Sequence, residues 1–278
     1  MIEILSDMIS TPFSRGVVFA YFGFIIGSML NMLSYRLPLI WGYTLKGFNS
    51  HHSLMNRSHC PKCDHIIAWY DNIPIFSYLA LGGRCRHCDT AIPKEYLLTE
   101  LFTGMIFAVL SITPSNWDPL LFSIDVVIFS LLILIAKIDI AIYKIPNKLS
   151  ACLFVALLVR SVFSGPDGYL MFIVSASIGY FVIQLVLFCL WWIRGSEKVV
   201  FGAGDVKFMA ILAGGVGLSL SMSFFVLSCL MFLAFAIAQK AARNQKIPFA
   251  PSLSLAFMVF YISRDIQSMQ PFLDILRL

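Results

Sequence analysis

Residues 119–139 read PLLFSIDVVIFSLLILIAKID, an apolar run that ends in an aspartate. About twenty residues of α-helix, at ~1.5 Å each, cross the hydrocarbon core of a membrane. Composition agrees, because the 278 residues are 59% hydrophobic and 13% charged, whereas soluble domains are about 25% charged. The net charge of +5 does not indicate nucleic acid as a partner, since the basic residues fall between the apolar runs. The sequence therefore predicts a polytopic protein that lies in a lipid bilayer.

Other apolar segments resemble this one, so we predict an all-α fold with about eight transmembrane helices. The boundary at 219–221 is the least distinct, because residues 205–239 also fit one long bent helix. The expected spans are 17–37, 96–113, 119–138, 148–164, 169–193, 205–219, 221–239 and 251–266.

Lysine and arginine are concentrated in every second connection between these segments. The connections 114–118, 165–168 and 219–221 contain neither residue. Because basic loops stay on the cytoplasmic side of a membrane, the loop 38–95 is predicted to face the cytoplasm and both termini to face away from it. The later basic clusters are Lys137/Lys144/Lys148, Arg194/Lys198 and Lys240/Arg243/Lys246.

The chain is expected to divide into three parts by function. Residues 1–37 form an N-terminal segment with the first transmembrane helix. Residues 38–95 form a small cytoplasmic domain, which has no apolar run long enough to span and holds four of the seven cysteines. Residues 96–278 form the main transmembrane domain.

Two CxxC pairs lie in the small domain, Cys60-Pro-Lys-Cys63 and Cys85-Arg-His-Cys88. Two thiolates at this spacing hold one metal ion, and two such pairs complete a tetrahedral four-thiolate shell. The alternative is a pair of disulfides, which a reducing cytoplasm disfavours. We predict a structural zinc site, because four protein ligands leave no position for a substrate. The neighbouring alternative ligands are His59, His65 and His87.

Two aspartates are placed where membrane helices are expected to meet the cytoplasm. Asp139 ends the third apolar segment, and Asp205 follows the glycine loop Gly202-Ala203-Gly204. Taken singly, Asp205 fits a helix N-cap and Asp139 fits a solvated residue just past a helix end. Those roles leave Gly202 and Gly204 unexplained, whereas glycines permit unusual backbone angles and the close approach of an extended substrate.

Two neighbouring carboxylates do not both ionise easily, so one serves as an acid while the other activates water. Asp139 and Asp205 are therefore predicted to form an acid–base pair that hydrolyses a peptide bond. Asp125 lies on the same segment as Asp139, but ~21 Å away along the helix. We expect Asp125 to make a buried polar contact between helices and to take no part in the site.

In combination, these motifs resemble those of the type IV prepilin peptidases, which are membrane aspartyl proteases and N-methyltransferases of the GxGD class. The resemblance extends over nearly the whole chain. Met29, Leu97, Asn147 and Ala250 depart from the family's residues, and Leu97 lies in a region that the family links to methylation. The matching motifs are Gly27-Ser-Met-Leu-Asn31 with Tyr35-Arg-Leu-Pro38, Asp71-Asn-Ile-Pro74, both CxxC pairs, Tyr96-Leu-Leu-Thr-Glu100, Asp139 with Ile145-Pro-Asn147, Gly202 to Lys207, and Ile247-Pro-Phe-Ala-Pro251.

The resemblance implies cleavage of the basic leader of prepilins or pseudopilins at the cytoplasmic face of a bacterial inner membrane, with Asp139 and Asp205 as catalytic residues. It also implies that S-adenosylmethionine methylates the new N-terminus and that zinc stabilises the cysteine domain. Glu100 is the candidate for methyl transfer, because a carboxylate can anchor the sulfonium or the new ammonium group. Its alternative role is a solvated residue at a helix entry.

Two other functions stay open from the sequence. One is a peptidase of the same family that lacks methylation. The other is a transporter that uses the two aspartates as ion ligands. The sequence does not locate a methyl-donor pocket, because it contains no glycine-rich strand-to-helix turn of the dinucleotide-binding type.

Overall fold

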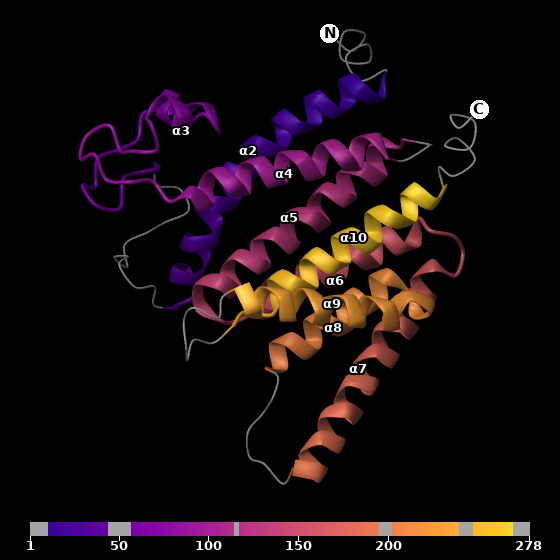
Figure 1. Cartoon of the computed structure of the whole chain (residues 1–278). Coiled ribbons are helices and arrows are strands. Elements are labelled where there is room, and N and C mark those ends of the chain that lie inside the picture. The colour runs from indigo at the N-terminus through magenta and orange to yellow at the C-terminus, as the bar shows by residue number, and fades with distance from the viewer. Residues whose placement is uncertain (1–10, 44–56, 114–116, 195–201, 239–246, 269–278) are drawn as a thin grey trace. The chain divides into compact units, whose positions relative to one another are not determined.

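The structure is a computed structural model of the chain. Among the residues it describes, regular secondary structure is helical and no strand occurs, apart from two isolated β-bridges. Contacts divide the chain into two compact units, Met1–Trp117 and Asp118–Leu278, and Figure 1 traces the helices of each. The three-part division by function stays a prediction. The described residues are 11–43, 57–113, 117–194, 202–238 and 247–268.

Each of the eight predicted spans is a helix in the described part of the chain, which confirms the all-α fold. The helices α2, α4, α5, α7 and α9 are long and apolar enough to cross a membrane. In the first unit the helices are α2 (Pro12–Ile40), the 3-10 helix η1 (Trp69–Asn72), α3 (Phe76–Ala80) and α4 (Lys94–Ile112). In the second unit they are α5 (Pro119–Ile142), α6 (Asn147–Val162), α7 (Gly168–Arg194), α8 (Ala203–Val216), α9 (Leu218–Ala238) and α10 (Ala250–Ser268). Both chain ends and the clusters at Lys198 and Lys240/Arg243/Lys246 lie outside the described residues.

Local chemistry explains where several helices begin and end. Asp118 caps the start of α5, where its Oδ1 accepts a hydrogen bond of 2.7 Å from the backbone N–H of Leu120. Gly217 separates α8 from α9, and its φ of +89° is a backbone conformation that favours glycine. The region that also fitted one long helix is therefore two helices, divided just before the predicted position.

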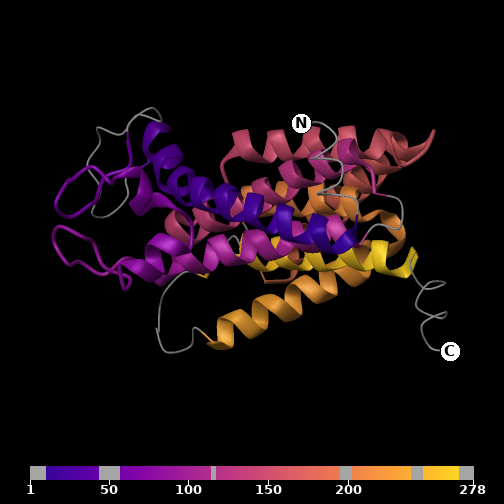
Figure 2. The same ribbon diagram turned by 90° about the horizontal axis from the view of Figure 1, so that it is seen from above.

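In the first unit, α2 and α4 lie side by side and run in opposite directions, as Figures 1 and 2 show. The contact is close because glycines face it. A Cβ atom added at Gly23 would lie 2.6 Å from the Cα of Gly104, and one added at Gly27 would lie 2.8 Å from the Cα of Glu100. Small residues four apart commonly bring membrane helices together in this way. One turn further along α2, Asn31 Nδ2 donates a hydrogen bond of 3.0 Å to the carbonyl of Tyr96.

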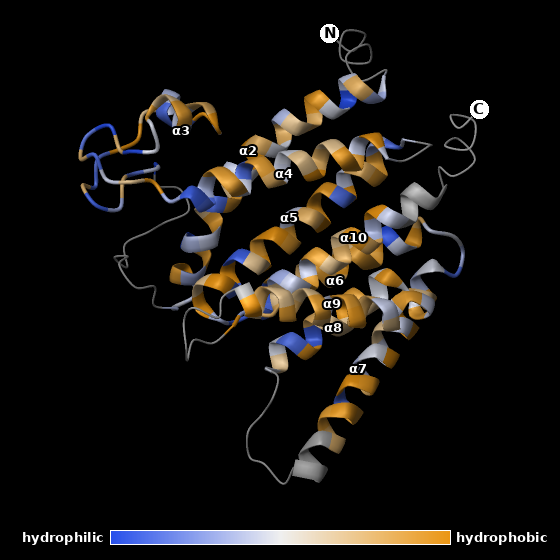
Figure 3. Cartoon of the chain, viewed as in Figure 1, coloured by the Kyte–Doolittle hydropathy of each residue, from blue (hydrophilic) through white to orange (hydrophobic). Residues whose placement is uncertain are grey.

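In the second unit, α5, α6, α8 and α10 form a closed ring of packed helices. Helix α5 contacts α6 and α10, and α8 contacts the same two neighbours. Fully buried side chains such as Ile128, Phe208 and Phe257 fill the ring. By contrast, α7 and α9 leave many apolar side chains exposed, as expected for helices surrounded by lipid, and Figure 3 shows hydrophobic residues along them.

Asp125 links three helices of this ring. Arg160 Nε on α6 donates a hydrogen bond of 2.9 Å to Asp125 Oδ1. The hydroxyl of Tyr261 on α10 donates to the same oxygen. Asp125 and Tyr261 are buried, so the expected polar contact between helices is confirmed.

Breaking this pair from one side should destabilise the protein. Arg160→Met leaves a buried carboxylate without its cation, which is expected to cost about 3–5 kcal/mol of unfolding free energy. The double change Asp125→Leu with Arg160→Met removes both charges and should recover most of that loss. Thermal unfolding in detergent, followed by circular dichroism, compares the stability of the wild type, the single variant and the double variant. An Arg160→Met protein as stable as the wild type would contradict the prediction.

Candidate active site and metal centre

Asp139 lies within the last turn of α5, which continues to Ile142. It is 4% exposed and so is not a solvated residue beyond a helix end. Its Oδ2 accepts a hydrogen bond of 3.0 Å from the backbone N–H of Ala250, the first residue of α10. A carboxylate fixed by a backbone donor at a helix N-terminus is held in one orientation.

Asp205 is the third residue of α8 and is not its N-cap, a position that Gly202 occupies. Its Oδ2 accepts a hydrogen bond of 3.2 Å from the Gly202 N–H. The expectation of unusual backbone angles is wrong, because Gly202 is extended (φ −69°, ψ 146°) and Gly204 is helical. Close approach is what these glycines provide. A Cβ added at Gly202 would lie 3.0 Å from Asp205 Oδ2, and one added at Gly204 would lie 3.4 Å from the Cβ of Ile145.

Both aspartates lie near helix ends in the second unit. Asp139 is in the last turn of α5 and Asp205 in the first turn of α8, and both helices pack against α10. At the start of α8, Gly204 lies close to Ile145, just beyond the end of α5. Two carboxylates placed together can share protons, as acid–base hydrolysis requires.

The four cysteines of the first unit also come together. Their sulfur atoms all lie within 4.8 Å of one another, and Cys60 Sγ lies 3.7 Å from Cys88 Sγ. Sulfurs bound at ~2.3 Å to a tetrahedral zinc ion are ~3.8 Å apart. Each CxxC pair closes a matching turn, in which the first cysteine's N–H bonds to the carbonyl of His65 or Thr90.

The thiols of this cluster differ in acidity. Hydrogen bonding with Thr90 lowers the pKa of the Cys88 thiol to about 6, whereas the pKa of the Cys63 thiol is raised to about 11, since its backbone hydrogen bond at His65 is outweighed by desolvation and the neighbouring thiols. The thiolate is the form of cysteine that binds metal. The metal-ligand group found in the described residues consists of the cysteines alone. His65 and His87 instead stack on each other, with ring centroids 3.4 Å apart.

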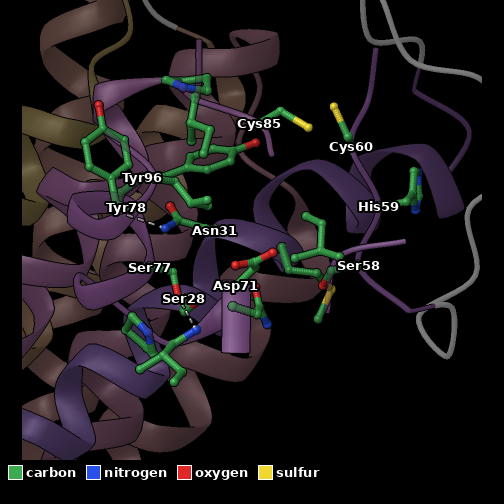
Figure 4. A pocket seen from close by; sticks show the side chains of 18 of the residues that line it. Ser28, Asn31, Ser58, His59, Cys60, Asp71, Ser77, Tyr78, Cys85 and Tyr96 are labelled. Atoms are coloured by element: carbon green, nitrogen blue, oxygen red, sulfur yellow. Dashed lines mark hydrogen bonds between the residues drawn. The ribbon is translucent and has the colours of Figure 1, made fainter. Parts of the chain in front are cut away.

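A cavity of about 550 Å³ lies beside the cluster, entirely within the first unit. Figure 4 shows Asn31, Asp71 and Tyr96 around it, with the sulfur atoms of Cys60 and Cys85 facing each other at its edge. Arg86 makes a bidentate ion pair with Asp71, with distances of 2.6 and 2.8 Å. That pair ties η1 to the second CxxC turn.

Glu100 lines the same cavity and is buried. Its Oε2 accepts a hydrogen bond of 2.8 Å from the N–H of Ile75. Ile75 has a φ of +64°, which is rare and strained for a β-branched residue. Glu100 is therefore not a solvated residue at a helix entry, and it supports a strained turn at the wall of the cavity. No motif in the sequence indicates this contact.

Comparison with known proteins shows the family of this chain. Residues 21–113 match the bacterial Peptidase A24 N-terminal domain, and residues 126–237 match the type IV leader peptidase family. A prepilin leader peptidase/N-methyltransferase of Vibrio cholerae serotype O1 is 30% identical over 89% of this chain and 96% of its own length. The chain belongs to the type IV leader peptidase family.

Other relatives agree with this assignment. A type 4 prepilin-like proteins leader peptide-processing enzyme of Escherichia coli O78:H11 is 32% identical over 88% of this chain and 92% of its own length. A prepilin leader peptidase/N-methyltransferase of Myxococcus xanthus is 31% identical over 84% and 70%. No solved structure matches the chain. The family resemblance seen in the motifs is thus confirmed, and this family member is an aspartic endopeptidase with several membrane helices.

Proposed function

We propose that this leader peptidase removes the basic leader of type IV prepilins or pseudopilins and then methylates the new N-terminus. The observation that carries the proposal is the position of Asp139 and Asp205 near the ends of two helices, α5 and α8, that both pack against α10. Each carboxylate accepts a hydrogen bond from a backbone N–H, of Ala250 and of Gly202. We place the site at these helix ends, which suits a scissile bond at the end of a substrate's membrane helix.

Hydrolysis in this proposal needs only the two carboxylates and water. One aspartate is ionised and takes a proton from the water as its oxygen attacks the scissile carbonyl carbon. The other is protonated and hydrogen-bonds to the carbonyl oxygen. The C–N bond then breaks as the leaving nitrogen receives a proton from the dyad. The N–H groups of Ala250 and Gly202 each donate to one oxygen of these carboxylates and so fix their orientation.

For methylation, we propose that S-adenosylmethionine binds in the cavity of the first unit. Its volume falls within the range of about 300–1,000 Å³ that is usual for small-molecule sites. The lining combines tyrosine rings, which suit a purine, with the carboxylate of Glu100, which suits a cation. When bound, the donor supplies a methyl group activated on a sulfonium. Glu100 would hold a cationic group at the wall of the cavity.

Zinc on the four cysteines completes the proposal, and the basic residues of the same loop favour the cytoplasmic side of an inner membrane. The sulfur spacing fits the ion, and a small loop domain gains stability from such a site. The role is structural, because four thiolates close the coordination shell.

Removing one cysteine should therefore remove the metal. The wild-type protein is expected to hold about one zinc per chain, and Cys60→Ser should lose most of it. Residues 57–93 should then become sensitive to protease, because the metal no longer holds the two turns together. Metal analysis and limited proteolysis measure both effects, and Cys152→Ser, on α6, is the matched control. Undiminished zinc in Cys60→Ser would contradict the assignment.

The function itself is tested with a prepilin co-expressed with the enzyme and examined by mass spectrometry. The proposal expects a product that has lost its leader and gained one methyl group. Loss of the leader without methylation would mean that the protein is a peptidase that lacks methyltransferase activity. An intact prepilin would overturn the proposed function.

A further inference from the structure

Residues 69–81 of the first unit carry an unusual amount of exposed apolar surface. From Ile73 to Leu81 the chain reads IPIFSYLAL, with no charged residue. Phe76 and Leu79 are 63% and 64% exposed, and Trp69 just before the run is 77% exposed. Exposed aromatic and aliphatic side chains gathered in one short segment indicate an interaction surface.

The depth of this segment follows from its contact with α4. Helix α4 has 19 residues, which gives ~28 Å, so a span across the ~30 Å hydrocarbon core uses nearly its whole length. Glu100 lies six residues after Lys94, and so ~9 Å inside that helix. Because the Ile75 N–H bonds directly to Glu100 Oε2, this placement of α4 puts Ile75 below the membrane surface. Phe76 follows it.

Several backbone groups of this segment are hydrogen-bonded within the protein, which a membrane environment favours. Phe76 N–H donates to the Pro74 carbonyl at 2.7 Å across the tight turn at Ile75. Ser77 Oγ accepts from the Ile73 N–H and donates to the Tyr70 carbonyl, both at 2.8 Å. The turn thus reverses the chain without leaving these groups exposed to lipid.

We propose that residues 69–81 anchor the cysteine domain in the membrane. Phe76 and Leu79 enter the acyl chains of the leaflet on the zinc side, and Trp69 and Tyr70 lie at the level of the lipid headgroups. Lipid is the expected occupant, because the segment is hydrogen-bonded to α4, a candidate membrane helix that exposes apolar side chains of its own. Tryptophan and tyrosine are the aromatic residues that favour the membrane interface.

Fluorescence quenching tests the depth directly, in the full-length protein held in bilayers. The background is Trp69→Phe, to which either Phe76→Trp or Lys62→Trp is added. Lys62 is exposed in the first CxxC turn and serves as the aqueous control. Bilayers with lipids brominated near the start of the acyl chains are compared with unbrominated bilayers, and iodide is titrated from water.

At position 76, the ratio of bromolipid quenching to iodide quenching should be much larger than at position 62, because a tryptophan among acyl chains is shielded from an ion in water. The fluorescence of the wild-type protein minus that of Trp69→Phe is the signal of Trp69 itself. Bromolipid should quench this signal too, in a protein with no introduced tryptophan. Melting temperatures near that of the wild type show that the variants are folded. Quenching of position 76 by iodide alone would overturn the proposal. Quenching by neither agent would place protein over Phe76 and would overturn it equally.

Discussion

Leader cleavage should fall by about 10²–10⁴-fold when either Asp139 or Asp205 is replaced by asparagine. The amide has nearly the same shape, and its carbonyl oxygen can still accept the N–H of Ala250 or Gly202. It cannot take a proton from water or give one to the leaving nitrogen. The loss therefore reports chemistry rather than folding. Initial rates of leader removal, measured by mass spectrometry of the prepilin, give the value.

Two comparisons make this result specific. Asp118→Asn, at the start of α5, changes a carboxylate on the same helix as Asp139 to an amide that caps a helix equally well, so cleavage should be unchanged. The double variant Asp139→Asn with Asp205→Asn should be no slower than either single variant, because residues that act as a unit are not additive. Near-normal cleavage by either single variant would remove that aspartate from the dyad.

The second large effect concerns Glu100. Two substitutions distinguish the role of its negative charge from the role of its hydrogen bond to the Ile75 N–H. Glu100→Gln keeps an oxygen that can accept the Ile75 N–H but removes the negative charge. If that charge anchors a cation, methylation should fall by about 10–100-fold, which corresponds to a lost charged hydrogen bond of ~1.5–3 kcal/mol. Leader cleavage should persist, because the dyad belongs to the other unit. The product should then be cleaved and unmethylated.

Glu100→Leu removes both the charge and the acceptor, so it should also loosen the turn at Ile75. Its methylation should be at least as low as that of Glu100→Gln, with a lower melting temperature. Glu95→Gln, exposed in the first turn of α4, is the control and should methylate normally. If Glu100→Gln methylates at the wild-type rate while Glu100→Leu does not, Glu100 supports the turn and does not bind the donor.

The sequence predicted the features of this protein that depend on local patterns. Apolar runs predicted eight spans and each is a helix in the described residues, because burial in lipid requires a continuous apolar stretch. The CxxC spacing predicted which cysteines would meet, since each pair closes its own turn. Asp125 was assigned correctly because its distance along α5 excluded it from the Asp139 site.

What the sequence could not predict depends on partners that are distant in the chain. Nothing near Glu100 indicates that its carboxylate bonds to Ile75, since no short-range rule describes a turn held from another helix. The Gly23 and Gly27 contacts with α4 likewise depend on how two helices align. The expected role of Gly202 in unusual backbone angles was wrong, because the residue instead leaves room for the Asp205 carboxylate.

The bond from Ala250 to Asp139 joins residues 111 positions apart. A ribosome delivers the chain from its N-terminus at ~5–20 residues per second, so α5 exists for roughly 6–22 s before Ala250 is made. Throughout that interval the Asp139 carboxylate lacks the N–H that orients it. The α10 helix, which is made after α5 to α9, thus supplies the N–H that orients a side chain made much earlier. On the proposed mechanism, a nascent molecule therefore lacks a complete protease site while its own helices are still entering the membrane.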